Sequence, residues 1–212
     1  MRLLLTGFEP FGGERVNPSE EVVRAIADEP PEGIELTTRV LPVRPRSAFD
    51  HLLPVLEAGD FDAWLGLGEA GGRAYLSVER VGINVFVDAA LPADERREVA
   101  IVEGGPAGYF ARLPLAELVG RMQEAGAPSV ASNTAGTYCC NESLYAVQHY
   151  LERSGRAMPS GFIHLPYLPE QTVEKAAGTP SMALETQVLG VRAAIELLRD
   201  RVAARASELT PA

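Results

Sequence analysis

The chain has 212 residues, of which 46% are hydrophobic, and a formal net charge of −10 at pH 7. This length is enough for one well-filled core, so we expect a single domain over residues 1–212. The negative charge would repel polyanions, and no stretch approaches the roughly 18 consecutive apolar residues of a membrane-spanning helix, so neither nucleic acids nor membranes are expected partners.

The N-terminus predicts a strand followed by a helix. Arg2–Thr6 carries one positive charge and an apolar run that is too short for a signal peptide, so we interpret it as the first core strand of a cytoplasmic protein. Asn17 is a good helix N-cap, with Pro18 at the first helical position and Glu20 at the third. We therefore expect a helix to begin at Pro18.

Hydrophobic periodicity predicts the remaining elements. Apolar runs predict strands over residues 34–41, 63–68, 78–87, 129–132 and 161–165. Helical spacing predicts helices over residues 47–58 with an end or kink at Pro54, around 115–122, over 140–151, and from Thr179 onward. This alternation predicts an α/β fold, namely a single-domain three-layer α/β/α sandwich around a twisted, largely parallel (mixed) sheet. Such sheets carry their chemistry at the carboxyl ends of strands.

A glycine-rich loop follows the expected strand at 63–68. Gly66–Gly71 matches the G-x-G-x-x-G pattern of dinucleotide-binding loops, but that pattern is informative only when a helix follows it. Residues 73–87 alternate like a strand, and Glu69 would place a negative charge among the phosphates. We therefore expect a loop whose backbone and Glu69 approach a different ligand, and no nucleotide cofactor.

The two cysteines are adjacent, so they cannot link distant parts of the fold, and a reducing compartment would keep them as thiols. Three isolated histidines do not form a zinc ligand set, so we expect no metal site. Cys140 lies at the expected helix start, where free N–H groups favour a thiolate and an oxyanion. Position alone leaves two interpretations equally open: a nucleophile, or a small buried apolar residue. Cys139 is expected to line the pocket wall.

A nucleophilic thiol needs a base, and histidine is the best candidate. His149 lies nine residues beyond Cys140, about 180° around the same helix, and His51 lies in a polar stretch. His164 is the only polar residue in Gly161–Pro166, near the carboxyl end of its strand. We therefore favour His164 as base over the alternative of a hydrogen-bonded structural histidine. Glu79 is a candidate to orient the imidazole, or else forms an ordinary ion pair with Arg80.

Taken together, these residues resemble the pyroglutamyl peptidase I (pyrrolidone-carboxylate peptidase) family of cysteine peptidases. Five blocks match in order, which is far more specific than any one of them. They are Thr6–Gly13 with Asn17-Pro18, Gly68 with Ala70–Arg73, Glu79–Val81 with Ile83-Asn84, Ala135–Tyr138 with Cys140-Asn141, and Gly161–His164 with Pro166–Gln171.

The resemblance implies one catalytic domain over residues 1–212 that removes an N-terminal pyroglutamyl residue from peptides without cofactor or metal. It implies Cys140 as nucleophile, His164 as general base and acid, and Glu79 as the orienting carboxylate. It further implies a homodimer or homotetramer. By the same resemblance the substrate-binding residues are Phe8, Phe11, Glu69, Leu91, Tyr138 and Cys139.

Four positions depart from the family pattern. Glu69 stands where the family usually has glutamine, and an ionised carboxylate only accepts hydrogen bonds. Ala90 stands where the family often has arginine, and Cys139 and Glu142 replace an apolar residue and a histidine that are more usual. Two alternatives to a pyroglutamyl peptidase follow: a related thiol amidase with shifted specificity, and a non-catalytic protein that binds small lactams.

Overall fold

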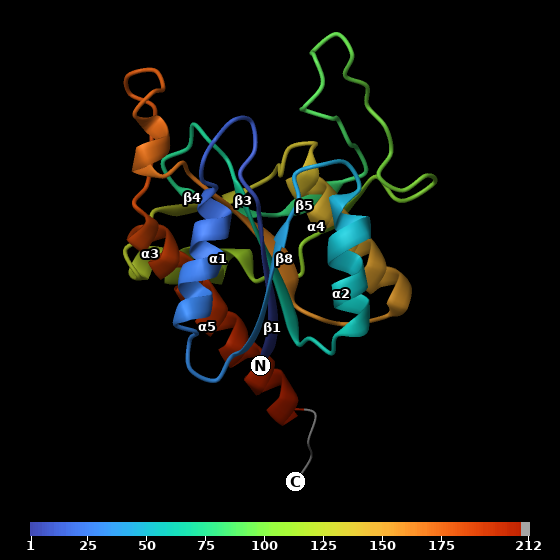
Figure 1. The fold of residues 1–212 in the computed structure, drawn as a ribbon. Helices are drawn as coiled ribbons and strands as arrows, with labels where there is room; N and C mark the ends of the chain where they lie inside the picture. Colours follow the sequence, from blue (N-terminus) through green and yellow to red (C-terminus); the bar gives the residue numbers. More distant parts are fainter. Residues whose placement is uncertain (209–212) are drawn as a thin grey trace.

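The computed structural model describes residues 1–208 and contains a six-stranded sheet with helices on both faces (Figure 1). The strand order is β2-β1-β3-β8-β4-β7. The strands are β1 (Arg2–Phe8), β2 (Glu35–Leu41), β3 (Ala63–Glu69), β4 (Leu76–Glu79), β7 (Ser129–Ser132) and β8 (Ser160–Leu165).

Strand direction changes once across this sheet. The strands β2, β1, β3 and β8 are parallel, β4 is antiparallel to β8, and β7 is parallel to β4. Four strands therefore end at one edge of the sheet, and β4 runs against them. The prediction of a largely parallel, mixed sheet is confirmed.

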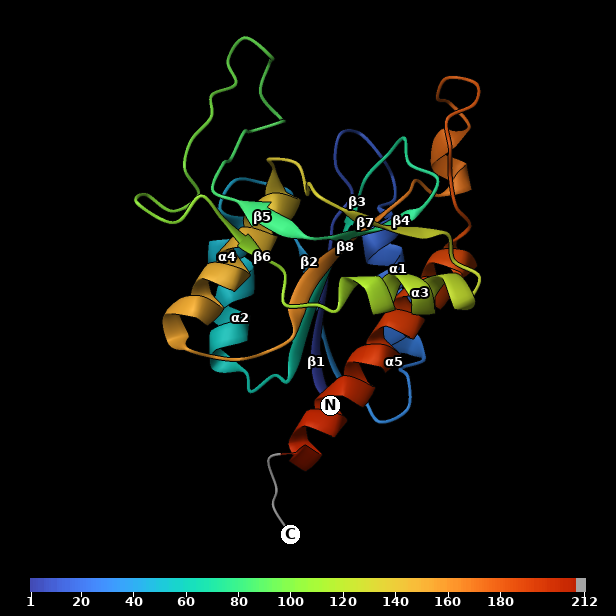
Figure 2. The same cartoon turned by 180° about the vertical axis from the view of Figure 1, so that it is seen from behind.

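Side-chain alternation along the strands separates two cores. Leu3 and Leu5 of β1 face the core beneath α1 (Pro18–Asp28), α3 (Leu115–Glu124) and α5 (Leu184–Glu208), and Leu4 faces the core beneath α2 (Leu53–Ala58) and α4 (Cys139–Ser154). Figures 1 and 2 show these two helical layers on opposite faces of the sheet. The three-layer α/β/α sandwich is therefore confirmed.

Three predicted elements have different bounds from those expected. The predicted strand over 78–87 is divided into β4 and β5 (Val81–Ile83), and β5 pairs with β6 (Gly108–Phe110), a short strand that periodicity did not predict. The division between β4 and β5 occurs at Arg80. Its backbone N–H donates to the carbonyl of Ser132, and its carbonyl accepts from the N–H of Ala111. The chain thus leaves the main sheet there.

The helix predicted from Thr179 begins only at Leu184. The preceding segment is held to the β8 end of the molecule, because the N–H of Met182 donates to the carbonyl of Tyr167 at 2.9 Å. The helix predicted over 47–58 is a π-helical turn, η1 (Ala48–Leu52), followed by α2. Pro54 lies in the first turn of α2, where a missing N–H is tolerated.

The edge at which β1, β3 and β8 end carries the long loops. The segment between β5 and β6 projects from this edge (Figures 1 and 2), and residues 91–100 within it are exposed. A 3-10 helix, η2 (Pro169–Thr172), follows β8 on the other side. Within residues 1–208 no helix has the length and apolar character needed to cross a membrane.

Candidate active site

The loop from β7 to α4 places two cysteines at a helix start. Tyr138 is the N-cap of α4, so Cys139 and Cys140 are its first two residues. Gly136 has a φ of 76°, a left-handed conformation that favours glycine, immediately before this start. The first turn of a helix has N–H groups without intrahelical acceptors. The predicted position of Cys140 in the first turn of a helix is confirmed.

The sulfur of Cys140 lies directly against Gly68 of β3. A Cβ atom at Gly68 would lie 2.6 Å from Cys140 Sγ and 2.9 Å from the ring of Phe162, so this position has no room for a side chain. Gly68 is also paired in register with His164 on the neighbouring strand β8. The thiol and the imidazole therefore lie over adjacent strands, and both line one cavity of about 170 Å³.

His164 is fixed by Glu79 from the antiparallel strand. In the ladder His164 lies opposite Ser77, and Glu79, two residues further along β4, is on the same face. Glu79 Oε1 lies 2.8 Å from His164 Nδ1. The Glu79 side chain is 0% exposed, and that of His164 is 6% exposed. Of the interpretations left open for Glu79, the contact with His164 is present; Arg80 instead donates to Asn133 at 2.8 Å.

Glu79 also has a cationic neighbour, Arg73, that the sequence did not single out. Arg73 Nη1 lies 3.1 Å from the same oxygen, Oε1. Oε2 is buried and has no hydrogen-bond partner in the part of the chain that the structure describes. The buried carboxylate therefore relies on two donors that share one oxygen.

The other histidines lie elsewhere. His149 Nδ1 is 2.9 Å from the hydroxyl of Tyr109, and His51 Nε2 is 2.6 Å from Arg44. Neither lines the cavity of Cys140. Among the described histidines, only His164 both lines the cavity of Cys140 and contacts a carboxylate.

The environment of Cys140 differs from the one predicted. Its helical position was expected to lower the thiol pKa, but burial raises it, with further increases from the charges of Cys139, Glu79 and Glu69. The backbone N–H of Cys140 acts in the opposite direction and is outweighed. The direction of this shift is opposite to the one predicted from the helix start alone.

Five of the six predicted substrate-binding residues line the Cys140 cavity, and Leu91 does not. Leu91 lines a neighbouring cavity of about 390 Å³ beneath the β5–β6 segment, together with Glu142. Those that line the Cys140 cavity are Phe8, Phe11, Glu69, Tyr138 and Cys139. The remaining lining residues were not predicted to bind substrate: Ala135, Gly136 and Thr137 were named only within the matched blocks, Asn17 was named there and as a helix cap, and Val43 was not named. The predicted role of Asn17 as a helix cap is confirmed, because its Oδ1 accepts from Ser19 N at 2.9 Å.

Cys139 is held away from the chemistry. Its side chain is 2% exposed, and Sγ donates to the carbonyl of Arg44 at 3.4 Å. Burial, with a contribution from Glu142, raises the pKa of Cys139 to about 12. Cys139 is buried whereas Cys140 is partly exposed, and this difference in exposure separates the two adjacent cysteines.

Glu142 connects α4 to the loop after β2. Its two carboxylate oxygens accept from the backbone N–H groups of Arg46 at 2.9 Å and Ala48 at 3.1 Å. Arg46 has a φ of 65°, the only positive φ of a non-glycine residue among the described residues. Burial raises the pKa of Glu142, and these two backbone bonds oppose the increase. The unusual glutamate thus holds a strained turn beside the cavity.

Glu69 reaches the cavity from the carboxyl end of β3. Its Oε2 accepts from Gln171 Nε2 at 2.7 Å, and Gln171 Oε1 in turn accepts from Leu168 N at 2.9 Å. Burial is the largest effect on the Glu69 carboxyl and raises its pKa. The position at which the chain departs from the family pattern is therefore a carboxyl group in the wall of the thiol cavity.

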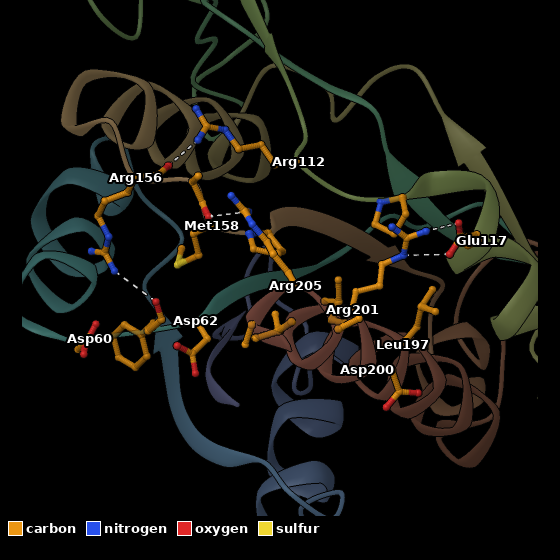
Figure 3. Close-up of a pocket in the computed structure, with 18 residues that line it drawn as sticks. Asp60, Asp62, Arg112, Glu117, Arg156, Met158, Leu197, Asp200, Arg201 and Arg205 are labelled. Atoms are coloured by element: carbon orange, nitrogen blue, oxygen red, sulfur yellow. Dashed lines mark hydrogen bonds and ion pairs between the residues drawn. The ribbon is translucent and has the colours of Figure 1, made fainter. Parts of the chain in front are cut away.

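A larger cavity of about 1200 Å³ lies at the opposite end of the sheet, beside the second half of α5 (Figure 3). Its arginines are engaged within the protein: Arg201 pairs with Glu117, and Arg156 donates to the carbonyls of Leu56 and Phe61. No residue of the predicted site lines it.

Known proteins are similar to this chain over nearly its whole length. A sequence profile of the pyroglutamyl peptidase family matches residues 1–201. The pyrrolidone-carboxylate peptidase of Coprothermobacter proteolyticus is 42% identical over 202 residues, covering 94% of this chain and 97% of the relative. That of Yersinia pestis is 42% identical over 203 residues, covering 92% of each.

Solved structures are similar over nearly the whole chain. The pyrrolidone carboxyl peptidase of Fervidobacterium islandicum AW-1 superposes with a TM-score of 0.87 at 36% identity, covering 94% of this chain and 99% of the other. The pyroglutamyl peptidase I of Bacillus amyloliquefaciens gives a TM-score of 0.85 at 33% identity, covering 93% and 94%.

Proposed function

This chain belongs to the pyroglutamyl peptidase family of cysteine peptidases, and from that premise we propose that Cys140, His164 and Glu79 form its catalytic triad. The proposed reaction is hydrolysis of the amide bond that follows an N-terminal pyroglutamyl residue of a peptide. The observation that carries the proposal is the 2.8 Å contact between His164 Nδ1 and Glu79 Oε1, made by a histidine that shares a cavity with Cys140.

Acylation begins from a neutral thiol. The raised pKa of Cys140 means that the proton leaves as the sulfur attacks, and His164 Nε2 is the group that takes it. Glu79 keeps Nδ1 protonated, so that Nε2 carries the free lone pair, and then stabilises the imidazolium. His164 next gives this proton to the leaving amine, which departs as the shortened peptide.

Deacylation repeats the proton transfer with water. His164 removes a proton from a water molecule that attacks the thioester, and returns it to the sulfur as pyroglutamate leaves. Both steps pass through an oxyanion. The N–H groups at the start of α4, next to Cys140, are suited to stabilise it, because they have no acceptor within the helix.

The size of the cavity explains why cleavage would be confined to the N-terminal residue of a peptide. A space of about 170 Å³ suits a small ring rather than an extended chain, and Phe8 and Phe11 provide apolar surface beside the thiol. A residue preceding the ring would have no space in a cavity of this size. We therefore propose that pyroglutamate is bound between these phenylalanine side chains and the loop 135–138.

A fluorogenic pyroglutamyl amide tests the proposal. The purified full-length protein with reduced thiols should release the fluorophore between pH 5 and 9, and Cys140→Ser should abolish turnover. His164→Gln should lower kcat by several orders of magnitude without changing the melting temperature by more than a few degrees. An intact reporter across this pH range would refute the proposed substrate.

The proposal also includes an oligomeric state and a cellular location. We propose that the protein forms a homodimer or homotetramer, an expectation supported by its family, and light scattering of the purified chain tests it. We also propose that it acts in the cytoplasm, where both thiols would stay reduced, and cell fractionation tests this.

A further inference from the structure

The carboxyl group of Glu69 lies in the same cavity as the nucleophile. Glu69 follows Gly68, and the sulfur of Cys140 lies directly against Gly68. Both Glu69 and Cys140 line the cavity of about 170 Å³. The charge of Glu69 also contributes to raising the pKa of Cys140. Any group bound for attack at Cys140 is therefore bound within reach of this carboxylate.

No cation of the protein is bonded to that carboxylate. Among the residues that the structure describes, Gln171 is the hydrogen-bond partner of Glu69, and an amide carries no charge. Lys175 is nearby, but its ammonium group pairs with Glu14 and lies over the ring of Tyr167. A half-buried carboxylate with one neutral donor is incompletely compensated, and a bound cation would complete it.

The rest of the cavity is also suited to a cation. Phe8, Phe11 and Tyr138 line it, and aromatic faces attract positive charge. The cavity wall contains no lysine or arginine side chain in the described part of the chain. Its one basic group is His164, whose Nδ1 is bound to Glu79. When Glu69 is ionised, the cavity therefore carries a negative charge that no lysine or arginine side chain of its wall offsets.

These features distinguish between two rings of the same size. A pyroglutamyl ring presents one neutral N–H, which leaves a carboxylate without a counter-charge. A prolyl ring has the same five members, but its ring nitrogen is a secondary amine that is protonated near neutral pH and donates twice. Resting on the proposed function of this cavity, we propose that the enzyme also removes N-terminal prolyl residues from peptides, with Glu69 as the residue that selects the charged ring.

The chemistry of the triad does not change. Cys140 Sγ bonds to the prolyl carbonyl carbon, the amide C–N bond breaks, and the leaving amine takes the proton that His164 removed from the thiol. Water then breaks the thioester, which releases proline and restores the thiol. Burial raises the pKa of Glu69, and a bound ammonium group would favour its ionised form.

Three reporters with one fluorogenic amine test the proposal on the full-length protein at pH 7. They carry a prolyl, a pyroglutamyl or a cyclopentanecarbonyl group, the last being a ring of the same size without nitrogen. We expect the parent protein to cleave the prolyl reporter at least about tenfold faster, in kcat/KM, than the cyclopentanecarbonyl reporter, the scale of a charge-assisted hydrogen bond.

Variants then assign the preference to Glu69. Glu69→Gln should lower prolyl kcat/KM by about tenfold to a hundredfold and raise pyroglutamyl kcat/KM. Glu170→Gln is the matched control, because it removes an equal charge from an exposed position outside the cavity. It should change neither value by more than about twofold.

The outcomes are separable. If the pyroglutamyl reporter is cleaved and the prolyl reporter is not, the inference is overturned while the proposed function stands. Equal rates for the prolyl and cyclopentanecarbonyl reporters on the parent protein would also overturn it, and this comparison does not depend on any variant folding. Prolyl cleavage without pyroglutamyl cleavage would support the inference and refute the proposed substrate.

Discussion

Arg73 and His164 donate to one and the same oxygen atom. Oε1 of Glu79 lies 3.1 Å from Arg73 Nη1 and 2.8 Å from His164 Nδ1. Oε2 of this fully buried side chain has no hydrogen-bond partner within residues 1–208. Arg73 therefore compensates the negative charge with which Glu79 orients the imidazole. The positive charge of Arg73 also disfavours a positive charge on the imidazole ring.

Replacing Arg73 should change the pH dependence of catalysis. Arg73→Gln removes a positive charge from beside His164, so protonation of the imidazole becomes easier. The acid limb of the kcat/KM profile should move to higher pH by about one unit, the usual effect of a charge at this range. Arg73→Lys keeps the charge and should move the limb less. If kcat/KM instead fell by the same factor at every pH, Arg73 would only support the glycine-rich loop in which it lies.

Gly68 should not tolerate a methyl group. Gly68→Ala would place a Cβ atom 2.6 Å from Cys140 Sγ, so the sulfur must move from its position beside His164. We expect kcat to fall by at least about a hundredfold, because small displacements of a nucleophile are costly. Gly120→Ala in α3 is the control: its Cβ meets nothing within 4 Å, and it should stabilise the protein by about 0.5–1 kcal/mol without loss of activity.

Glu69 should limit pyroglutamyl hydrolysis at higher pH. Its pKa is raised by burial, so the carboxyl group remains protonated to a higher pH than a free glutamate and can then both donate and accept. As pH increases through this raised pKa, the ionised form leaves a charge unpaired against the lactam, and kcat/KM should decline. Glu69→Gln should remove the decline. Superimposable pH profiles for the parent and variant would contradict this prediction.

The two cysteines should differ in alkylation. Cys139 is buried and Cys140 is partly exposed, so iodoacetamide should modify Cys140 alone, as peptide mass spectrometry can establish. Because the pKa of Cys140 is raised, its labelling rate should increase about tenfold per pH unit between pH 7 and 9, as for an un-ionised thiol. A rate independent of pH would show a thiolate instead. Cys139→Ser should retain activity.

Loss of Glu142 should destabilise the fold. Glu142→Ala leaves the N–H groups of Arg46 and Ala48 without acceptors, at an expected cost of about 2–4 kcal/mol in the free energy of unfolding. Urea denaturation measures this value. Glu124→Ala, an exposed substitution at the end of α3, should change it by less than about 0.5 kcal/mol.

Local rules predicted much of this protein from its sequence. The N-cap at Asn17 and the position of Cys140 at a helix start follow from residues adjacent in the chain, and hydrophobic periodicity predicted most strands. Motif order was sufficient to single out Cys140, His164 and Glu79. These signals are local because capping and side-chain alternation depend on neighbours within one or two turns.

Tertiary packing decided the rest. The antiparallel pairing of β4 with β8 brings Glu79 to His164 across 85 residues, and Gln171 reaches Glu69 across 102. Leu91 lies in a neighbouring cavity because the segment after β5 leaves the main sheet. The pKa of Cys140 is raised rather than lowered, since desolvation depends on everything packed around the sulfur and outweighs the helix start.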